Sequence, residues 1–137
     1  MSDEKGIEVK NLWKYYDKFC AVESLNLEVR SGEIFGLLGS NGAGKSTTIK
    51  SIVGLTSHDK GEILICGIDA DAHPIEAKSK LGYIPENPAY YGRLKGREFL
   101  NLCASIRGNG REKINSLAEK FGVADKLDEQ ICTYSKG

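Results

Sequence analysis

The sequence lacks a long hydrophobic run and an excess of charge of either sign. Lys plus Arg and Asp plus Glu both number 19, so the formal net charge is zero. Proteins that coat nucleic acid carry a broad basic surface, and we expect no nucleic-acid partner. No stretch reaches the roughly 18 consecutive apolar residues that cross a bilayer. The opening residues, MSDEK, also lack the apolar core of a secretory signal.

Cysteine and histidine are too scattered to indicate a metal site. None of the four cysteines belongs to a C-x-x-C pair, and neither histidine lies near one at ligand spacing, which disfavours zinc. We interpret the cysteines as small buried apolar groups in a reducing compartment. His58 and His73 fall in loops, and we expect both to be solvated. The cysteines are Cys20, Cys66, Cys103 and Cys132.

The 137 residues are enough for one modest domain, which opens with strands. Residues 7–12 and 25–29 alternate apolar and polar side chains, as is typical of half-buried strands, and residues 19–22 are a shorter candidate between them. Antiparallel strands with one solvent-exposed face are therefore expected first. Residues 34–38, Ile-Phe-Gly-Leu-Leu, form a continuous apolar run, which predicts a strand buried on both faces of a mostly parallel sheet.

Strands and helices then follow in turn as far as residue 92, after which the pattern is helical. Helices are predicted where apolar residues recur at steps of three and four, and Gly54 and Gly122 are suited to end two of them. The change near residue 93 indicates a subdomain boundary, with residues 1–92 before it and 93–137 after it. The predicted helices are residues 46–53, 74–80, 99–106 and 114–121, and the further strands are residues 62–66 and 81–85.

Residues 39–46, GSNGAGKS, fit the phosphate-binding pattern G-x-x-x-x-G-K-[ST] without a gap. Glycines let the backbone curl so that successive N–H groups face phosphate oxygens, and the following helix adds the positive end of its dipole. Lys45 is suited to neutralise the β- and γ-phosphates, and the Ser46 hydroxyl is the expected Mg²⁺ ligand. The proposed phosphate contacts are Gly39, Ser40, Asn41, Gly42, Ala43, Gly44, Lys45 and Ser46.

A chance match to this pattern occurs at on the order of one position in ten thousand. The required context, an apolar strand before the loop and a helix after it, is also predicted here. The alternative, a Gly-rich turn with an incidental lysine at a helix start, is therefore disfavoured.

The residues around this Walker A loop resemble the ATP-binding cassette (ABC) ATPases over essentially the whole chain. The resemblance is carried by residues 38–48 (LGSNGAGKSTT), 61–63 with 67–69, 81–86 (LGYIPE, like the Q-loop of the family) and 96–100 (GREFL). It is closest to subunits that pair with separate membrane proteins of the ABC-2 type. It implies an α/β P-loop NTPase fold, an ABC-type nucleotide-binding domain incomplete at its C-terminus. An antiparallel β-subdomain, a mostly parallel core sheet with the Walker A helix and the start of a helical subdomain are its expected parts.

The resemblance also assigns roles to residues outside the loop. Tyr16 stands where the family has an aromatic ring that stacks on adenine, although Tyr16 could instead only cover the sheet, and Tyr15 is the alternative stacking residue. Thr47 would add a phosphate hydrogen bond, unless it is simply a helix-surface residue. Glu86 takes the place of the Q-loop glutamine that reaches Mg²⁺ and the attacking water, with a solvated loop acid as the alternative. Lys95 replaces a threonine that would cap the next helix, a loss of about 1 kcal/mol.

Residues 134–137, YSKG, look like the opening of the family's signature motif. The resemblance gives Ser135 and Gly137 contacts to the γ-phosphate held by the opposite subunit, and the alternative is a frayed tail. The Walker B acids and the switch histidine of the family would follow after residue 137. Residues 1–137 are therefore expected to bind nucleotide at most, and the complete protein to hydrolyse ATP. The family topology also places further strands between residues 34–38 and 81–85, so these two segments are expected to lack partners here.

The function implied by the resemblance is that of the ATP-binding subunit of an ABC transporter. It would bind ATP and Mg²⁺, pair with a second ATPase subunit of the same or another kind, and contact an integral membrane subunit around residues 86–100. Its expected location is cytoplasmic, on the inner face of the cell membrane. The alternatives are a soluble ABC protein of the translation-factor type and a nucleotide-binding module without enzymatic activity. A GTPase is disfavoured because no Asn-Lys-x-Asp motif is present.

Overall fold

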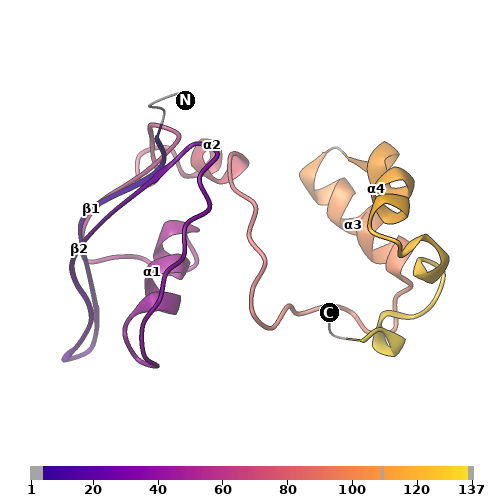
Figure 1. The fold of residues 1–137 in the computed structure, drawn as a ribbon, viewed down its shortest axis with the longest axis horizontal. Coiled ribbons are helices and arrows are strands. Elements are labelled where there is room, and N and C mark those ends of the chain that lie inside the picture. The colour runs from indigo at the N-terminus through magenta and orange to yellow at the C-terminus, as the bar shows by residue number, and fades with distance from the viewer. Residues whose placement is uncertain (1–4, 109, 136–137) are drawn as a thin grey trace. The chain divides into compact units, whose positions relative to one another are not determined.

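The computed structural model describes residues 5–108 and 110–135, and the chain divides into two compact units between Ile84 and Pro85 (Figure 1). Each unit has its own group of buried apolar side chains. In the part of the chain that the structure describes, no helix is long and apolar enough to cross a membrane.

An antiparallel sheet organises the first unit. Its strands are β1 (Lys5–Tyr16), β2 (Phe19–Arg30), β3 (Lys60–Ile65) and β4 (Ile68–Asp69), in the spatial order β2-β1-β3-β4. The strands predicted at residues 7–12 and 62–66 are confirmed, and those at residues 19–22 and 25–29 are two parts of β2. β1 and β2 form a hairpin whose turn is made by residues 17 and 18.

A bulge in β1 decides which of its side chains face the core. Asn11 has a φ of 49°, and the register with β2 shifts between Val9 and Leu12. The Asn11 amide oxygen accepts hydrogen bonds from Trp13 Nε1 at 3.0 Å and from Ser24 Oγ at 2.8 Å, which stabilises this conformation. Because one residue is added at the bulge, Val9 and Leu12 are both buried, and Lys14, two residues after Leu12, is buried as well.

Two helices pack on this face of the sheet. They are α1 (Lys45–Ile52) and α2 (Pro74–Ser79), so the helices predicted at residues 46–53 and 74–80 are confirmed. Figure 1 shows α1 lying beside the β1–β2 hairpin. The core that the sheet and helices share consists of Val9, Leu12, Val22, Ile52, Ile63, Ile65 and Ala77.

The prediction of buried strands at residues 34–38 and 81–85 is wrong. Neither segment belongs to a strand, and Ile34, Leu38 and Ile84 are almost fully exposed. A strand requires a neighbour to satisfy its N–H and C=O groups, and none of the described segments pairs with either one. The one sheet of the described residues is antiparallel, so the parallel core sheet implied by the resemblance is not formed within them.

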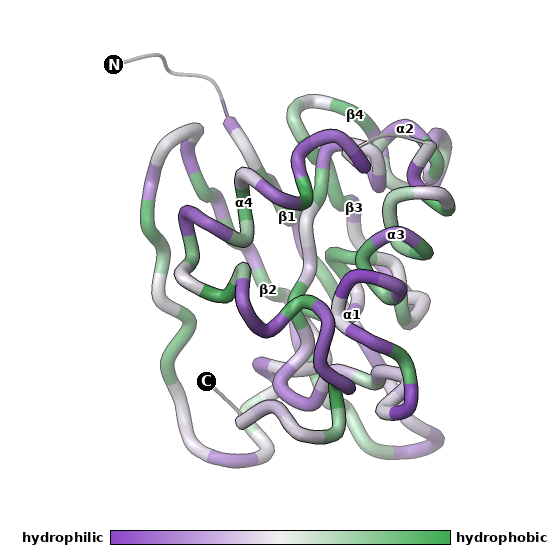
Figure 2. The backbone as a smooth tube through the Cα atoms, turned by 90° about the vertical axis from the view of Figure 1, so that its right-hand side faces the viewer, coloured by the Kyte–Doolittle hydropathy of each residue, from purple (hydrophilic) through white to green (hydrophobic). Residues whose placement is uncertain are grey.

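The second unit is helical. It contains α3 (Gly96–Arg107) and α4 (Ile114–Lys120), with 3₁₀ turns at Arg111–Lys113, Ala124–Lys126 and Ile131–Thr133. Apolar and polar residues interleave along α3 and α4 (Figure 2), as expected of helices with one buried side. Both predicted helices are confirmed, and Gly122, with a φ of 68°, follows the end of α4.

The start of α3 shows what replaces the missing threonine cap. The Lys95 ammonium has no lone pair and cannot accept a hydrogen bond. Instead, the Glu98 carboxylate accepts one from the Lys95 N–H at 2.8 Å. The Arg97 guanidinium then ties α3 to the rest of the unit, donating to Asp128 Oδ1 at 3.0 Å and to Asn115 Oδ1 at 2.7 Å. The hydrogen bond from Arg97 to Asp128 lowers the pKa of the Asp128 carboxyl group.

Candidate nucleotide-binding site

The Walker A loop curls directly in front of helix α1. Gly42 and Gly44 have φ values of 86° and 80°, in the left-handed region that glycine adopts without strain. The Ala43 N–H donates to the Ser40 carbonyl at 3.2 Å, and the Thr48 N–H donates to the Gly44 carbonyl at 2.8 Å, which begins the helix. The helix predicted after the loop is present, whereas the strand predicted before it is not.

Strand β2 supports the loop from behind. A Cβ atom on Gly44 would overlap the Ala21 carbonyl oxygen and would lie 3.3 Å from Val22 Cγ2. A Cβ atom on Gly42 would have no other atom within 4 Å apart from its neighbours along the chain. The loop is therefore pressed against the sheet at Gly44 and has open space at Gly42.

The Lys45 ammonium lies over the carbonyl groups of its own loop. Its Nζ donates to Gly39 O at 2.7 Å and to Ser40 O at 2.6 Å, so the positive charge is held at the loop. The N–H groups of the first turn of α1 have no acceptor within the helix, and the helix dipole adds positive potential at the same end. Ser46 is exposed at this end, and Thr47 is half-buried. The backbone N–H groups, the Lys45 ammonium and the Ser46 hydroxyl together are suited to bind a metal-bound polyphosphate.

Of the two tyrosines at the end of β1, Tyr16 lies on the same side of the sheet as the loop. Lys14 is buried like Leu12, on the face covered by α1, and its ammonium lies over the ring of Tyr16. Tyr16 is 46% exposed, and its cross-strand neighbour Phe19 is 62% exposed. The alternative residue, Tyr15, stacks on Trp13 with ring centroids 6.1 Å apart and an interplanar angle of 12°. This geometry favours Tyr16 as the stacking residue.

The structure adds a buried cation beside Tyr16 that the sequence analysis did not single out. Lys14 is only 7% exposed, and its Nζ lies 3.6 Å from Asp59 Oδ2 and 5.4 Å from the centroid of the Tyr16 ring. The backbone N–H of Tyr15 donates to Asp59 Oδ2 at 2.7 Å. That hydrogen bond, and secondly the charge of Lys14, lower the pKa of Asp59. Side chains of a strand point alternately to its two faces, so the position of Lys14 two residues after Leu12 could have indicated that this lysine faces inward.

Two minor predictions about histidine and cysteine are wrong. His58 is not a solvated loop residue, because its side chain is 10% exposed and its Nε2 lies 3.1 Å from Asp71 Oδ2, where the loop folds against the segment before α2. His73, in contrast, is exposed as expected. The free cysteines are not buried, since Cys20 and Cys103 are intermediate and Cys66 and Cys132 are exposed, in a turn and a 3₁₀ helix. Among the described residues, no His, Cys, Asp and Glu side chains form a metal-binding cluster.

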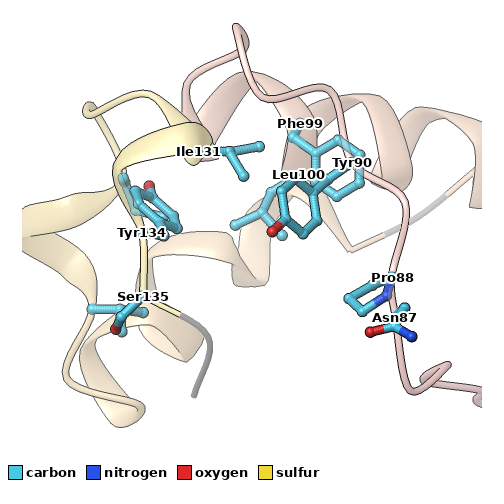
Figure 3. A pocket seen from close by; sticks show the side chains of 10 residues that line it. Asn87, Pro88, Tyr90, Phe99, Leu100, Ile131, Tyr134 and Ser135 are labelled. Atoms are coloured by element: carbon cyan, nitrogen blue, oxygen red, sulfur yellow. The ribbon is translucent and has the colours of Figure 1, made fainter.

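The remaining predicted site residues belong to the second unit. Glu86 is exposed in a segment without regular structure. Ser135 lines a cavity of about 550 Å³ together with apolar and aromatic side chains (Figure 3), among them Tyr90, Phe99 and Ile131. Gly137 lies outside the described residues. Because Ser46 and Glu86 are in different units, a Mg²⁺ site that joins them stays a prediction.

Comparisons with known proteins identify the family of the chain. A family model described as "ABC transporter" matches residues 22–137. A Bacillus subtilis protein described as an uncharacterized ABC transporter ATP-binding protein, YhcH, is 39% identical over 132 residues, which cover 96% of this chain and 43% of that protein. The Escherichia coli protein YbhF, described as a probable multidrug ABC transporter ATP-binding protein, is 40% identical over 124 residues, covering 88% of this chain and 22% of that protein.

A solved structure of an ATP binding subunit of an ABC transporter is also similar. Its TM-score is 0.83 at 34% sequence identity, and the match covers 95% of this chain and 56% of that one. The chain thus spans less than half the length of the two curated relatives.

The contrast between Gly42 and Gly44 predicts different costs for the same substitution in the nucleotide-free protein. Gly42→Ala places a side chain in open space and costs about 1–2 kcal/mol from the backbone conformation alone. Gly44→Ala adds the overlap with Ala21, worth a further 1–3 kcal/mol or so. Denaturation midpoints of the full chain should therefore fall further for Gly44→Ala. Equal midpoints would show that the loop does not press on β2.

Proposed function

Because this chain belongs to the ABC transporter family, we propose that it binds Mg-ATP as the nucleotide-binding part of a transporter's ATPase subunit. The observation that carries the proposal is the Walker A loop, curled in front of α1 with the Lys45 ammonium held at it. The relatives named above are themselves described as ATP-binding proteins.

The phosphates bind where the loop backbone and Lys45 converge. Main-chain N–H groups of residues 39–47 donate to phosphate oxygens, and Lys45 exchanges the neutral carbonyls of Gly39 and Ser40 for charged acceptors. The ammonium then faces a negative charge, so Coulomb attraction adds to the hydrogen bonds and the exchange is favourable. Thr47, in the first turn of α1, adds a hydroxyl donor.

The base stacks on Tyr16. The ring is exposed at the tip of the β1–β2 hairpin, and β2 continues from there to Ala21 and Val22, which support the loop at Gly44. The base and phosphate contacts thus come from one short stretch of connected backbone.

Ser46 and Glu86 would be the protein ligands of a Mg²⁺ ion, which would neutralise phosphate charge. A hydroxyl and a carboxylate are hard oxygen ligands, and Mg²⁺ commonly takes only one or two from the protein beside the nucleotide phosphates. ATP hydrolysis is assigned to the whole protein, since this chain covers only 43% and 22% of the two curated relatives. The loop and Lys45 would contribute positioning and charge stabilisation to phosphoryl transfer.

Two partners complete the proposal. The first is a second ATPase subunit, identical or different. Ser135 and Gly137 of this chain contact the γ-phosphate of the nucleotide that the second subunit holds. An integral membrane subunit docks around residues 86–100 on the cytoplasmic side, where Tyr90, Phe99 and Leu100 line the cavity of Figure 3. Apolar and aromatic side chains of this kind are enriched at the centres of protein interfaces.

Removing the Lys45 ammonium should abolish ATP binding by the full-length protein. Lys45→Ala loses the positive charge at the loop, whereas the control Lys50→Ala removes an exposed lysine of the same helix. Titration calorimetry with Mg-ATP should show no measurable binding for the first variant and unchanged affinity for the second. Undiminished affinity of Lys45→Ala would overturn the phosphate-clamp assignment.

Truncating Tyr16 should weaken ATP binding far more than binding of inorganic triphosphate. Loss of base stacking costs about 1–3 kcal/mol, so Tyr16→Ala should reduce ATP affinity about 5- to 150-fold. Tyr15→Ala is the matched control, because Tyr15 stacks on Trp13 instead. Equal losses for ATP and triphosphate would exclude stacking on Tyr16.

A further inference from the structure

Lys14 is the one buried charged side chain in the described ranges 5–108 and 110–135. It shares the inward face of β1 with Leu12, which is fully buried, and its cross-strand partner is Val22, which is 7% exposed. Lysine is almost never buried unless its charge is paired, because removing an ammonium from water is costly. Groups that contact this ammonium must therefore offset the cost of burying it.

Asp59 supplies the opposite charge and is itself fixed by the backbone on both sides of Lys14. Its Oδ2 accepts the Tyr15 N–H at 2.7 Å and lies 3.6 Å from Lys14 Nζ. Its own N–H donates to the Trp13 carbonyl at 2.8 Å. The hydrogen bond from Tyr15 lowers the pKa of Asp59 below its ordinary value. The ion pair is thus anchored to residues 13 and 15 of the strand that carries Lys14.

The second partner of Lys14 is the ring of Tyr16. The ammonium lies over the ring, 5.4 Å from its centroid, and so occupies one of its two faces. Nearly half of the Tyr16 side chain is still exposed. A free tyrosine at a hairpin end would exchange between rotamers and would have to be ordered when a ligand binds. The cation removes part of that cost by holding the ring in one orientation.

We propose that Lys14, anchored by Asp59, is a positioning residue that holds Tyr16 for stacking with the nucleotide base. The inference rests on the proposed function and adds to it a determinant of base recognition. The ammonium covers one face of the ring, and the base stacks on the exposed part that remains.

The same lysine also connects the base contact to the phosphate loop. Its cross-strand partner Val22 is the residue whose Cγ2 lies beside Gly44. Tyr16, Lys14, Val22 and Gly44 therefore form a continuous series of contacts from the hairpin tip to the loop. A base held at Tyr16 is thereby set at a fixed distance from phosphates held at the loop.

The experiment measures dissociation constants of the full chain for Mg-ATP and for inorganic triphosphate. Lys14→Met keeps the length of the side chain and removes its charge, and Lys14→Arg keeps a cation that can lie over an aromatic ring. Lys10→Met is the control, because Lys10 lies on the same strand but is exposed and pairs with Glu8 and Glu62. Lys14→Met should weaken ATP about 3- to 30-fold, the range expected for a desolvated cation–π contact.

Affinity for triphosphate should change less than about twofold, because Lys14→Met removes only the charge over the Tyr16 ring and keeps the length of the side chain. Lys14→Arg and Lys10→Met should bind ATP like the wild type. In a Tyr16→Ala background, Lys14→Met should cause no additional loss, because its effect passes through the ring. If Lys14→Met does not fold, Asp59→Asn provides the test, with the same selective loss of ATP affinity expected.

The inference is overturned if Lys14→Met leaves ATP affinity unchanged, weakens ATP and triphosphate equally, or has its full effect without the Tyr16 ring. Any of these results, obtained while Lys45→Ala still abolishes ATP binding, would leave the proposed function intact. If the wild-type protein binds no ATP, or binds it equally well without Lys45, the proposed function fails and the inference fails with it.

Discussion

The close approach of Gly44 to strand β2 is the contact on which the candidate site depends. There is no room for a Cβ atom between Gly44 and the Ala21 carbonyl, so only glycine lets the loop lie against the sheet. That contact sets the point at which α1 begins, with the Thr48 N–H bonded to the Gly44 carbonyl. The direction of the first helical N–H groups, and of the Lys45 side chain beside them, follows from this starting point.

The sheet behind the loop explains why base and phosphate contacts are joined. The chain turns at residues 17 and 18 after β1. Strand β2 then runs back past Tyr16 and reaches the loop within four residues, from Phe19 to Val22. The bulge at Asn11 decides that Lys14 and Tyr16, and not Tyr15, face the side covered by α1. A one-residue change in strand register would turn these side chains to the opposite face.

The sequence predicted local elements well and long-range pairing poorly. The Walker A loop and the strands and helices with clear periodicity are where the pattern placed them, because the spacing of apolar residues shows which period an element follows. Residues 34–38 and 81–85 were apolar enough for buried strands and were also expected to lack partners. A strand needs a hydrogen-bonded neighbour, and none of the described segments pairs with either one. The burial of Lys14 and of His58 was missed because it depends on Asp59 and Asp71, which lie far away in the sequence or on another loop.

The central claim is that loop amides and the Lys45 ammonium grip a nucleotide's phosphates. A crystal structure of the full-length protein with Mg²⁺ and a non-hydrolysable ATP analogue tests it most directly. The account predicts that Lys45 Nζ leaves the carbonyls of Gly39 and Ser40 and bonds to phosphate oxygens, with the loop N–H groups around them. A nucleotide bound elsewhere, with Lys45 still on its two carbonyls, would contradict the claim.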